Sequence, residues 1–195
     1  VGNISALVQS NVKRMLAFSS VSHAGYLVMG VLVNDGAGIS AILFYLVVYS
    51  AMNLGAFAII SLVEKDEQEV VFEDYRGMAS RNPLLSVAMA LFMISLAGFP
   101  PTAGFVAKYG LFSAAIENGY VWLVIIAVLN TLVSFYYYFR IIVNMYMRNE
   151  KEGLQPSMRF LTAGLIALFV AAVFLLGITP GYLLEITIDV ATGAS

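Results

Sequence analysis

Two ionisable side chains fall inside long apolar stretches of this sequence, where a charge is costly and therefore informative. At 1.5 Å per helical residue, Lys108 lies roughly 13 Å from Glu117, and His23 lies roughly 15 Å from Lys13. An amine or an imidazole near the middle of a membrane is a candidate for proton transfer, because each can gain and lose a proton. A structural ion pair for Lys108 and a packing role for His23 are the alternatives.

Hydroxyl and amide side chains recur on the expected helix faces around these two residues. Helical spacing places Ser19, Tyr26 and Gly30 on the same face as His23. Comparable polar stripes occur in two further apolar stretches, at Tyr45, Tyr49 and Asn53 and at Asn130, Ser134 and Tyr137. Such groups can hold a chain of water molecules, and they can equally join helices through hydrogen bonds. They cannot store charge at neutral pH.

The composition places the elements that carry these residues in a membrane. The 195-residue chain is 61% hydrophobic and 11% charged, and its mean hydropathy of +0.87 is far above that of a soluble domain. A hydrocarbon core about 30 Å thick needs about 20 apolar residues per helix. Five stretches are interpreted as complete spans: residues 15–33, 39–63, 84–115, 121–147 and 160–184. We therefore expect an all-α, polytopic membrane bundle that forms one transmembrane domain over residues 1–195, with residues 1–9 as the tail of a preceding helix of a larger protein.

The third stretch carries a break in its middle. Pro100 and Pro101 cannot donate in the helical hydrogen-bond ladder, and Gly98 and Gly104 flank them. Residues 98–104 are therefore predicted to interrupt the helix, with a simple proline kink as the alternative. Backbone carbonyls that a break frees are tolerated in a membrane only where protein or water satisfies them, and broken helices commonly mark ion sites. Lys108 lies in the second half of this broken helix.

Lysine and arginine are concentrated in alternate connections between the expected spans. The basic connections contain Lys13, Arg14, Lys65, Arg76, Arg81, Arg148, Lys151 and Arg159. The connections around Asp35 and Glu117 and the C-terminal segment with Glu185 and Asp189 contain no lysine or arginine. By the positive-inside rule, the basic side faces the cytoplasm or its organellar equivalent, and the C-terminus lies on the other side.

Two further features of the expected basic side are a long polar stretch and a cluster of tyrosines. Residues 64–83, the longest polar stretch, are interpreted as a solvated loop, with a docking surface for a neighbouring subunit as the alternative. Tyr136, Tyr137 and Tyr138 precede Arg140 and are interpreted as an interfacial aromatic belt with a cationic anchor.

Several kinds of chemistry have no support in the sequence. There is no cysteine, so the chain offers no thiolate for an iron–sulfur cluster, a zinc site or a disulfide. It contains no phosphate-binding glycine loop, no metal-ligand spacing, no nucleophile with an evident base and no basic face for nucleic acid. No cofactor or metal site is therefore expected in this chain, and any redox chemistry takes place elsewhere.

Two long segments carry a specific resemblance to a known family. Residues 9–26 read QSNVKRMLAFSSVSHAGY, and residues 96–108 read LAGFPPTAGFVAK. Together with DYRG at residues 74–77 and the cluster from Tyr136 to Arg140, they resemble the antiporter-like proton-channel subunits of NADH-quinone oxidoreductase, the respiratory complex I, over essentially the whole chain. Related L and M types and cation/proton antiporter subunits tend to carry ionisable residues around Tyr49 and Asn53. The neutral groups here make the chain most similar to the subunit N type and its counterpart in plastids.

The resemblance implies a larger parent subunit in which this chain supplies the last helices. It implies that Lys108 is the central lysine of a half-channel, that His23 is a relay and that Lys13 is the basic start of its helix. Catalytic proton transfer is thus expected at Lys108 and His23, in a subunit of a proton-translocating NADH- or NAD(P)H-quinone oxidoreductase. The membrane would be a bacterial plasma membrane, an organelle inner membrane or a thylakoid membrane.

The resemblance also sets expectations for cofactors and partners. NADH, flavin, iron–sulfur clusters and quinone are expected in partner subunits. The expected partners of the chain are other membrane subunits of the complex, the lipid bilayer and protons, with no nucleic acid.

Two alternatives to this function remain open. A cation/proton antiporter subunit or a membrane-bound hydrogenase subunit of the same superfamily is the alternative within transport. A non-conducting structural membrane module is the alternative from a different class. Copurification with flavin and iron–sulfur proteins favours the oxidoreductase, whereas sodium/proton exchange without them favours the antiporter. Loss of assembly with no separate transport defect favours the structural module.

The charge asymmetry makes a labelling prediction. Because the chain has no cysteine, the single variants Val70→Cys, Leu154→Cys and Asn118→Cys each report one connection. We expect Val70→Cys and Leu154→Cys to react with a membrane-impermeant maleimide from the cytoplasm-equivalent side, and Asn118→Cys from the opposite side. Labelling of all three from one side would contradict the five-span topology.

Overall fold

The chain is an all-α bundle, as the sequence predicts. The computed structural model describes residues 1–64, 70–149 and 160–193, and most of them are helical. The elements are α1 (Gly2–Leu7), α2 (Val12–Val33), α3 (Gly36–Val63), the 3-10 helix η1 (Phe72–Tyr75), α4 (Met78–Arg81), α5 (Pro83–Ala97), α6 (Ala103–Glu117), α7 (Val121–Met147), α8 (Phe160–Ile178) and α9 (Gly181–Thr192). Within these described ranges there is no β-strand, and one isolated bridge joins Asn11 to Val71.

Four helices are long and apolar enough to cross a membrane. They are α2, α3, α7 and α8, which are between 19 and 28 residues long and coincide with four of the expected spans. The fifth expected span, 84–115, is occupied by α5 and α6, which have 15 residues each and are individually too short to cross. The chain is therefore an integral, polytopic helical membrane protein.

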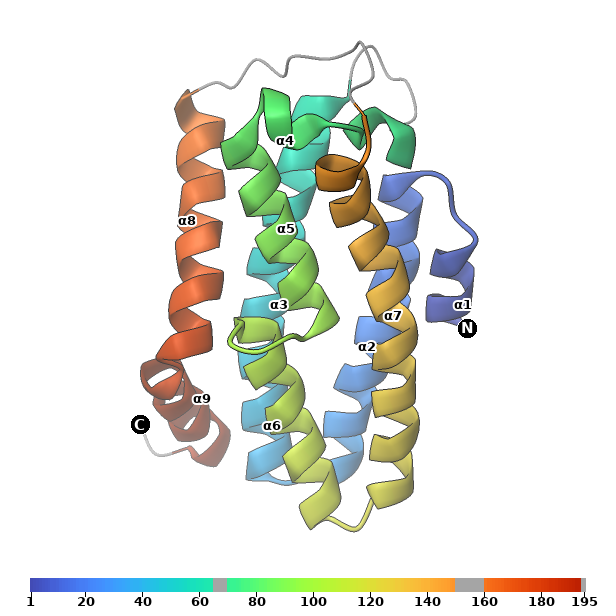
Figure 1. Cartoon of the computed structure of the whole chain (residues 1–195). Helices are drawn as coiled ribbons and strands as arrows, with labels where there is room; N and C mark the ends of the chain where they lie inside the picture. The colour runs from blue at the N-terminus through green and yellow to red at the C-terminus, as the bar shows by residue number, and fades with distance from the viewer. Residues whose placement is uncertain (65–69, 150–159, 194–195) are drawn as a thin grey trace.

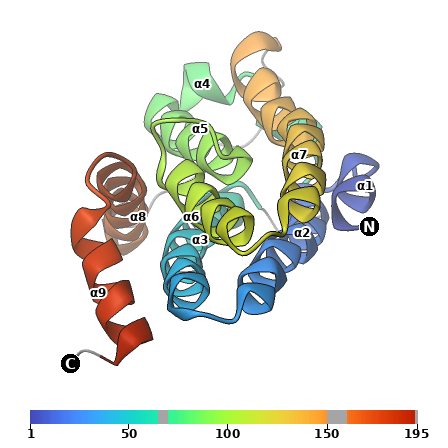
Figure 2. The ribbon, with the colours of Figure 1, turned by 90° about the horizontal axis from the view of Figure 1, so that it is seen from below.

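The helices pack around a common core with one helical layer on each flank. Figures 1 and 2 show α2, α3, α5, α6 and α7 grouped together, with α8 and α9 on the flank formed by α3 and α1 beside α2 and α7 on the other. Large side chains such as Tyr45, Met52 and Phe92 fill the centre. By contrast, α8 buries Ile166 and Val173 and leaves most of its other leucines and phenylalanines exposed, as a lipid-facing helix does.

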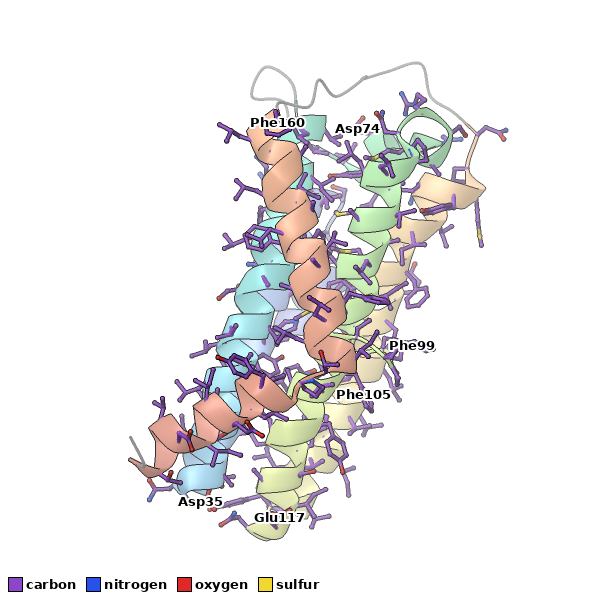
Figure 3. All side chains as sticks on the ribbon, turned by 90° about the vertical axis from the view of Figure 1, so that its left-hand side faces the viewer. Asp35, Asp74, Phe99, Phe105, Glu117 and Phe160 are labelled. Carbon is purple, nitrogen blue, oxygen red and sulfur yellow. The ribbon has the colours of Figure 1, made fainter. Side chains whose placement is uncertain are left out.

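The connections alternate between the two ends of the bundle. In Figure 3, Asp35 and Glu117 lie at one end, and Asp74 and Phe160 lie at the other. Asp35 caps α3 by accepting from Gly38 N–H at 2.7 Å, and the Asn118 amide donates to it at 3.1 Å. These two hydrogen bonds lower the pKa of Asp35, so its carboxylate remains charged at neutral pH. Of the basic residues assigned to the other end, Lys65, Lys151 and Arg159 lie outside the described residues.

Residues 70–81 are not a solvated loop, which corrects that part of the interpretation for 64–83. Val70, Phe72, Tyr75 and Met78 are buried. A cysteine at position 70 would therefore be shielded from the maleimide, and the exposed Glu73 is the position that reports this connection. The segment is also tied to the bundle by backbone hydrogen bonds from Val12 N–H to Val70 O at 3.0 Å and from Phe72 N–H to Ser10 O at 3.3 Å. Its charged residues surround a small apolar face that covers the ends of α2 and α7, and this explains why composition alone misled. Residues 65–69 of this stretch lie outside the described residues.

The backbone between α5 and α6 leaves the helical path. α5 ends at Ala97, and Gly98 follows with φ +86°, in the left-handed region that favours glycine. Its N–H donates to Ile94 O and Ser95 O, and Phe99 N–H donates to Ile94 O at 3.1 Å. α6 then begins at Ala103, and Gly104 N–H donates to the Ser95 hydroxyl at 3.0 Å. The start of α6 is thereby held against the end of α5.

The prediction of one continuous span over residues 160–184 was wrong, because the helix is shorter. α8 ends at Ile178, and α9 begins at Gly181 and runs at an angle to α8 (Figure 3). Pro180 between them has no N–H and cannot continue the hydrogen-bond ladder of α8. Ser40 of α3 and Thr187 of α9 share a buried hydrogen bond of 2.9 Å, which fixes α9 against α3.

Gly104 makes a stability prediction, because its missing side chain permits the contact between α5 and α6. A Cβ at this position would collide with the Ser95 backbone oxygen, which cannot move without unwinding α5. We expect Gly104→Ala to destabilise the fold by about 1–3 kcal/mol, as overpacking of a tight core does. The matched control is Gly164→Ala in α8, where an added Cβ meets nothing within 4 Å. The measurement is the thermal-unfolding midpoint of the detergent-solubilised protein, and equal midpoints for the two variants would contradict the close packing.

Candidate functional site

Lys108 is buried in the centre of the bundle and closes the end of α5. Its side chain projects from α6, is 5% exposed and donates from Nζ to Leu96 O and Ala97 O, each at 2.9 Å. These carbonyls belong to the last turn of α5, whose dipole concentrates partial negative charge at that end. The break predicted from the two prolines therefore has a partner for its freed carbonyls, and that partner is the lysine itself.

Gly98 permits this contact in two ways. Its φ of +86° turns the chain away from α5 at low cost, and a Cβ there would lie 2.9 Å from Lys108 Cδ and 3.1 Å from Nζ. A larger residue would push the amine away from the carbonyls. Gly98 is thus required both by its backbone conformation and by the space that Lys108 occupies.

The amine geometry suits both protonation states of Lys108. An ammonium has three donors, and two of them are used by Leu96 O and Ala97 O. The neutral amine keeps two N–H groups for the same carbonyls and gains a lone pair that can accept a proton. Losing or gaining the third proton therefore does not require the side chain to leave its site.

His23 lies in a buried cage of tyrosines. It is 2% exposed; its Nδ1 is 2.7 Å from the Tyr45 hydroxyl and its Nε2 is 3.1 Å from the Tyr138 hydroxyl. The ring stacks on Tyr49, with centroids 4.6 Å apart. Because a neutral imidazole has one donor and one acceptor nitrogen, it can accept a proton on one side and release one on the other.

Hydroxyl and amide groups extend the polar contacts of His23 along α7. The Tyr138 hydroxyl also shares a hydrogen bond with Ser19, one helical turn before His23. The neighbouring Tyr137 donates to Asn3 Oδ1 at 2.9 Å, and Asn3 donates to Asn130 O at 2.6 Å. This set of side chains joins α1, α2 and α7 through the interior of the protein.

Tyr26 lies between the two candidate residues. The Lys108 Nζ is 5.4 Å from the centroid of the Tyr26 ring, within the range of a cation–π contact. The same ring meets the His23 ring edge-on, with centroids 5.9 Å apart. Its hydroxyl is 3.0 Å from the Thr131 hydroxyl. Lys108 and His23 are therefore close neighbours across one aromatic ring, although they come from helices far apart in sequence.

A cavity of about 240 Å³ runs alongside Tyr26, between α1, α2 and α7. Its lining combines apolar side chains such as Met29, Leu123 and Ile126 with Ser22, Gly25, Tyr26 and Asn130. Small and polar residues of this kind leave room and hydrogen-bonding partners for water, which needs two to four polar contacts. Water in this space can reach the edge of the polar network at Tyr26.

The structure brings together some of the polar residues that sequence spacing singled out and separates others. Ser19, Tyr26, Tyr45 and Tyr49 surround His23. Asn53 is half-buried, and Ser134 donates within its own helix to Thr131 O at 2.6 Å. These last two residues do not reach His23 or Lys108 directly.

Tyr138 and Asn3 belong to the buried polar network, and the sequence interpretation missed both. The run of three tyrosines was interpreted as an interfacial belt, and this is wrong for Tyr137 and Tyr138, which are buried. Tyr136 alone of the three is exposed, at 64%. The signal was available: Tyr138 is four residues after Ser134 and shares its helix face. Asn3 carried no comparable signal, because its partner Tyr137 is 134 residues away.

The contacts of the described residues define a membrane protein whose interior holds buried polar and ionisable side chains. In the described ranges, no three histidine, cysteine or carboxylate side chains gather as they do around a metal ion. What the site offers is a buried amine at a helix break, a caged imidazole and a set of hydroxyl groups between helices.

The chain belongs to the NADH:quinone oxidoreductase/Mrp antiporter transmembrane family. The model of that family matches residues 1–134. The chain is 45% identical over 187 residues to NADH-quinone oxidoreductase subunit N 1 of Chloroherpeton thalassium, covering 95% of this chain and 39% of that protein. It is 53% identical over 153 residues to NADH-quinone oxidoreductase subunit N of Trichlorobacter lovleyi, covering 78% of this chain and 31% of the relative.

A solved structure shows the same fold. A chain of respiratory complex I from Thermus thermophilus with bound aureothin matches with a TM-score of 0.83 and 34% sequence identity, over 94% of this chain and 42% of that chain. The chain thus spans well under half the length of these relatives.

Proposed function

We propose that this chain is the C-terminal part of a proton-translocating, antiporter-like subunit of NADH-quinone oxidoreductase, of the subunit N type. The observation that carries the proposal is the Lys108 amine, buried at a helix break and bonded to Leu96 O and Ala97 O. A membrane-buried amine held by carbonyl oxygens rather than by a carboxylate is suited to gaining and losing a proton more than to forming a structural ion pair. Family membership and the subunit N relatives support the same function.

The proposed topology has five spans, with α5 and α6 crossing together as one broken span. Each half rises about 22 Å at 1.5 Å per residue, so the two joined end to end exceed the hydrocarbon core. Figure 1 shows α6 continuing from the end of α5 toward the opposite end of the bundle. α1 is proposed to be the tail of a preceding helix of the parent subunit.

We propose Lys108 as the protonatable switch of this half of the parent subunit. Two opposing effects act on its charge: apolar burial disfavours the ammonium, whereas the carbonyls of Leu96 and Ala97 and the face of Tyr26 favour it. A small change in the separation of α5 and α6 alters this balance, because both carbonyls belong to α5 and the amine belongs to α6. Movement driven by neighbouring subunits can therefore load and unload the proton.

We propose His23 as the relay that connects this switch to the rest of the polar axis. Its two nitrogens contact hydroxyls on different helices, Tyr45 on α3 and Tyr138 on α7. When a proton binds to one nitrogen, the other nitrogen can release its own proton. Water beside Tyr26 would complete the path between His23 and Lys108.

The remaining parts of the enzyme are assigned to other subunits. NADH, flavin, iron–sulfur clusters and quinone belong to partner subunits, with other membrane subunits, lipid and protons as partners of this chain. The membrane is that of a bacterium, or an organelle inner or thylakoid membrane, with the C-terminus on the non-cytoplasmic side. The chain itself has no cysteine for a redox centre.

A cation/proton antiporter subunit is the second candidate function, because the family also includes Mrp antiporters. Tyr49 and Asn53 favour the oxidoreductase, since both are uncharged and Tyr49 stacks on His23. Purification of the complex distinguishes the two: flavin and iron–sulfur proteins accompany the chain in the first case, and sodium-dependent proton exchange without them marks the second.

The relay role of His23 is tested with two substitutions. His23→Ala removes the imidazole, and His23→Gln keeps one donor and one acceptor but cannot pass a proton through a ring. We expect both variants to assemble and to show a several-fold loss of proton pumping per NADH oxidised in reconstituted vesicles. Wild-type pumping in His23→Gln would show that hydrogen bonding alone is needed, and would reduce His23 to packing.

The switch role of Lys108 is tested in the same assay. Lys108→Ala removes the protonatable group, and Lys108→Arg keeps a cation that stays protonated at any accessible pH. We expect both to assemble and to lose most of the proton pumping per turnover. The matched control is Lys13→Arg, which can keep the ion pair that Lys13 forms with Glu64 at 2.5 Å and should pump normally. Full pumping in assembled Lys108→Arg would return Lys108 to a structural role.

A further inference from the structure

A second polar site lies far from Lys108, at the basic end of the bundle. A cavity of about 560 Å³ opens between α7 and the segment formed by η1 and α4. It is lined by Arg76, Arg140 and Arg148, by one acidic residue, Glu73, and by apolar side chains that include Phe139 and Val143. Its volume is in the range of pockets that hold small molecules, about 300–1,000 Å³.

The walls of this arginine pocket are held in place by contacts outside it. Gly77 N–H donates to Asn144 O at 3.1 Å and fixes the η1–α4 segment to α7. The Arg140 guanidinium lies 4.0 Å above the Phe72 ring, and its Nη1 donates to Gln9 O at 3.2 Å. These two contacts orient Arg140, and its remaining guanidinium N–H groups are available to a ligand. A site that is oriented before its ligand arrives binds with a smaller entropy loss.

The positive charge of the arginine pocket is not neutralised by its own carboxylate. Among the described residues, no ion pair within 4.0 Å joins Glu73 to any of the three arginines. The Nε of Arg76 is buried without a hydrogen-bond partner, and Arg81, which donates to Arg76 O at 3.0 Å, has two further buried nitrogens in the same state. Buried guanidinium nitrogens without acceptors are costly, so an anion that accepts from them would be stabilised.

The position of the arginine pocket points to a membrane component. Arg140 lies about 10 Å along α7 from the helix end at Met147, a depth at which headgroups and acyl chains meet. Tyr136 and Phe139, which also line the pocket, are exposed on α7 toward the middle of the membrane. A ligand here would place a charged end among the arginines and an apolar end along these aromatic side chains.

We propose that the arginine pocket binds the phosphodiester headgroup of an anionic phospholipid, with its acyl chains lying along Tyr136, Phe139 and Val143. Guanidinium groups bind phosphate oxygens through paired hydrogen bonds, and basic pockets between helices on the cytoplasmic side of a membrane suit such lipids. The bound lipid would fasten the η1–α4 segment to α7. This binding is independent of the proton-transfer function proposed for Lys108.

The test uses the intact membrane complex in vesicles that contain a photoactivatable phosphatidylglycerol probe. After irradiation, mass spectrometry maps the cross-linked peptides. We expect the probe to label residues 136–148 several-fold more than a matched phosphatidylcholine probe, and excess unlabelled phosphatidylglycerol to compete. Arg76→Gln with Arg140→Gln should reduce the labelling several-fold. Arg148→Gln, on the exposed side of the pocket, provides a milder variant with the same expected direction, and Arg14→Gln is the control for loss of one basic-side charge.

Three outcomes would overturn the proposal. Equal labelling by the two lipid probes, or labelling that the pocket variants leave unchanged, would show that the pocket does not select an anionic headgroup. Displacement of the probe by millimolar inorganic phosphate, with no competition from phosphatidylglycerol vesicles, would assign the pocket to a free anion. An acidic peptide of a partner subunit cross-linked into the pocket in place of lipid would assign it to protein docking.

Discussion

The hydrogen bonds from the Lys108 amine to the carbonyl oxygens of Leu96 and Ala97 are the interaction on which the centre of the bundle depends. A helix break inside a membrane leaves carbonyls that lipid cannot satisfy. Here Lys108 of α6 donates hydrogen bonds to the last carbonyls of α5, so the break and the buried amine stabilise each other. Each feature offsets a cost of the other: the lysine gives the carbonyls a donor, and the carbonyls give the buried amine its acceptors.

This constraint explains the tight packing around the break. Gly98 and Gly104 leave space for the amine and for the Ser95 carbonyl, and Gly177 of α8 lies directly against the backbone of Pro101 and Thr102. The polar atoms of His23 are satisfied in a similar way, since each nitrogen of the imidazole has a hydroxyl partner in the tyrosine cage. Around the break, the polar groups of Lys108 and His23 are thus hydrogen-bonded among close-packed helices, and these two side chains are the members of this set that can carry a positive charge.

The sequence predicted the features that depend on position along a helix and missed those that depend on packing between helices. The burial depth of Lys108 and His23 follows from counting residues in uncharged runs, and the spans of α2, α3 and α7 follow from their length and composition. The Tyr138 contact with His23 joins residues 115 apart, and no local pattern reveals such a pair. The buried apolar face within residues 70–81 was hidden by the charged residues around it, and the turn at Pro180 was absorbed into an apolar run. In both cases the prediction used the average composition of a segment, whereas single residues, the buried apolar ones in 70–81 and Pro180, determine the structure.

The most direct measurement is a structure of the assembled, membrane-embedded complex at a resolution that shows ordered water. The proton exchange proposed between Lys108 and His23 requires a hydrogen-bonded route around the ring of Tyr26, because the amine and the imidazole are separated by that ring. We expect ordered water molecules that bridge the Lys108 Nζ to the hydroxyls of Tyr26 and Tyr45 while the carbonyls of Leu96 and Ala97 remain bonded to the amine. A dry, fully packed space between Lys108 and His23 in every state of the working complex would contradict the proposed exchange.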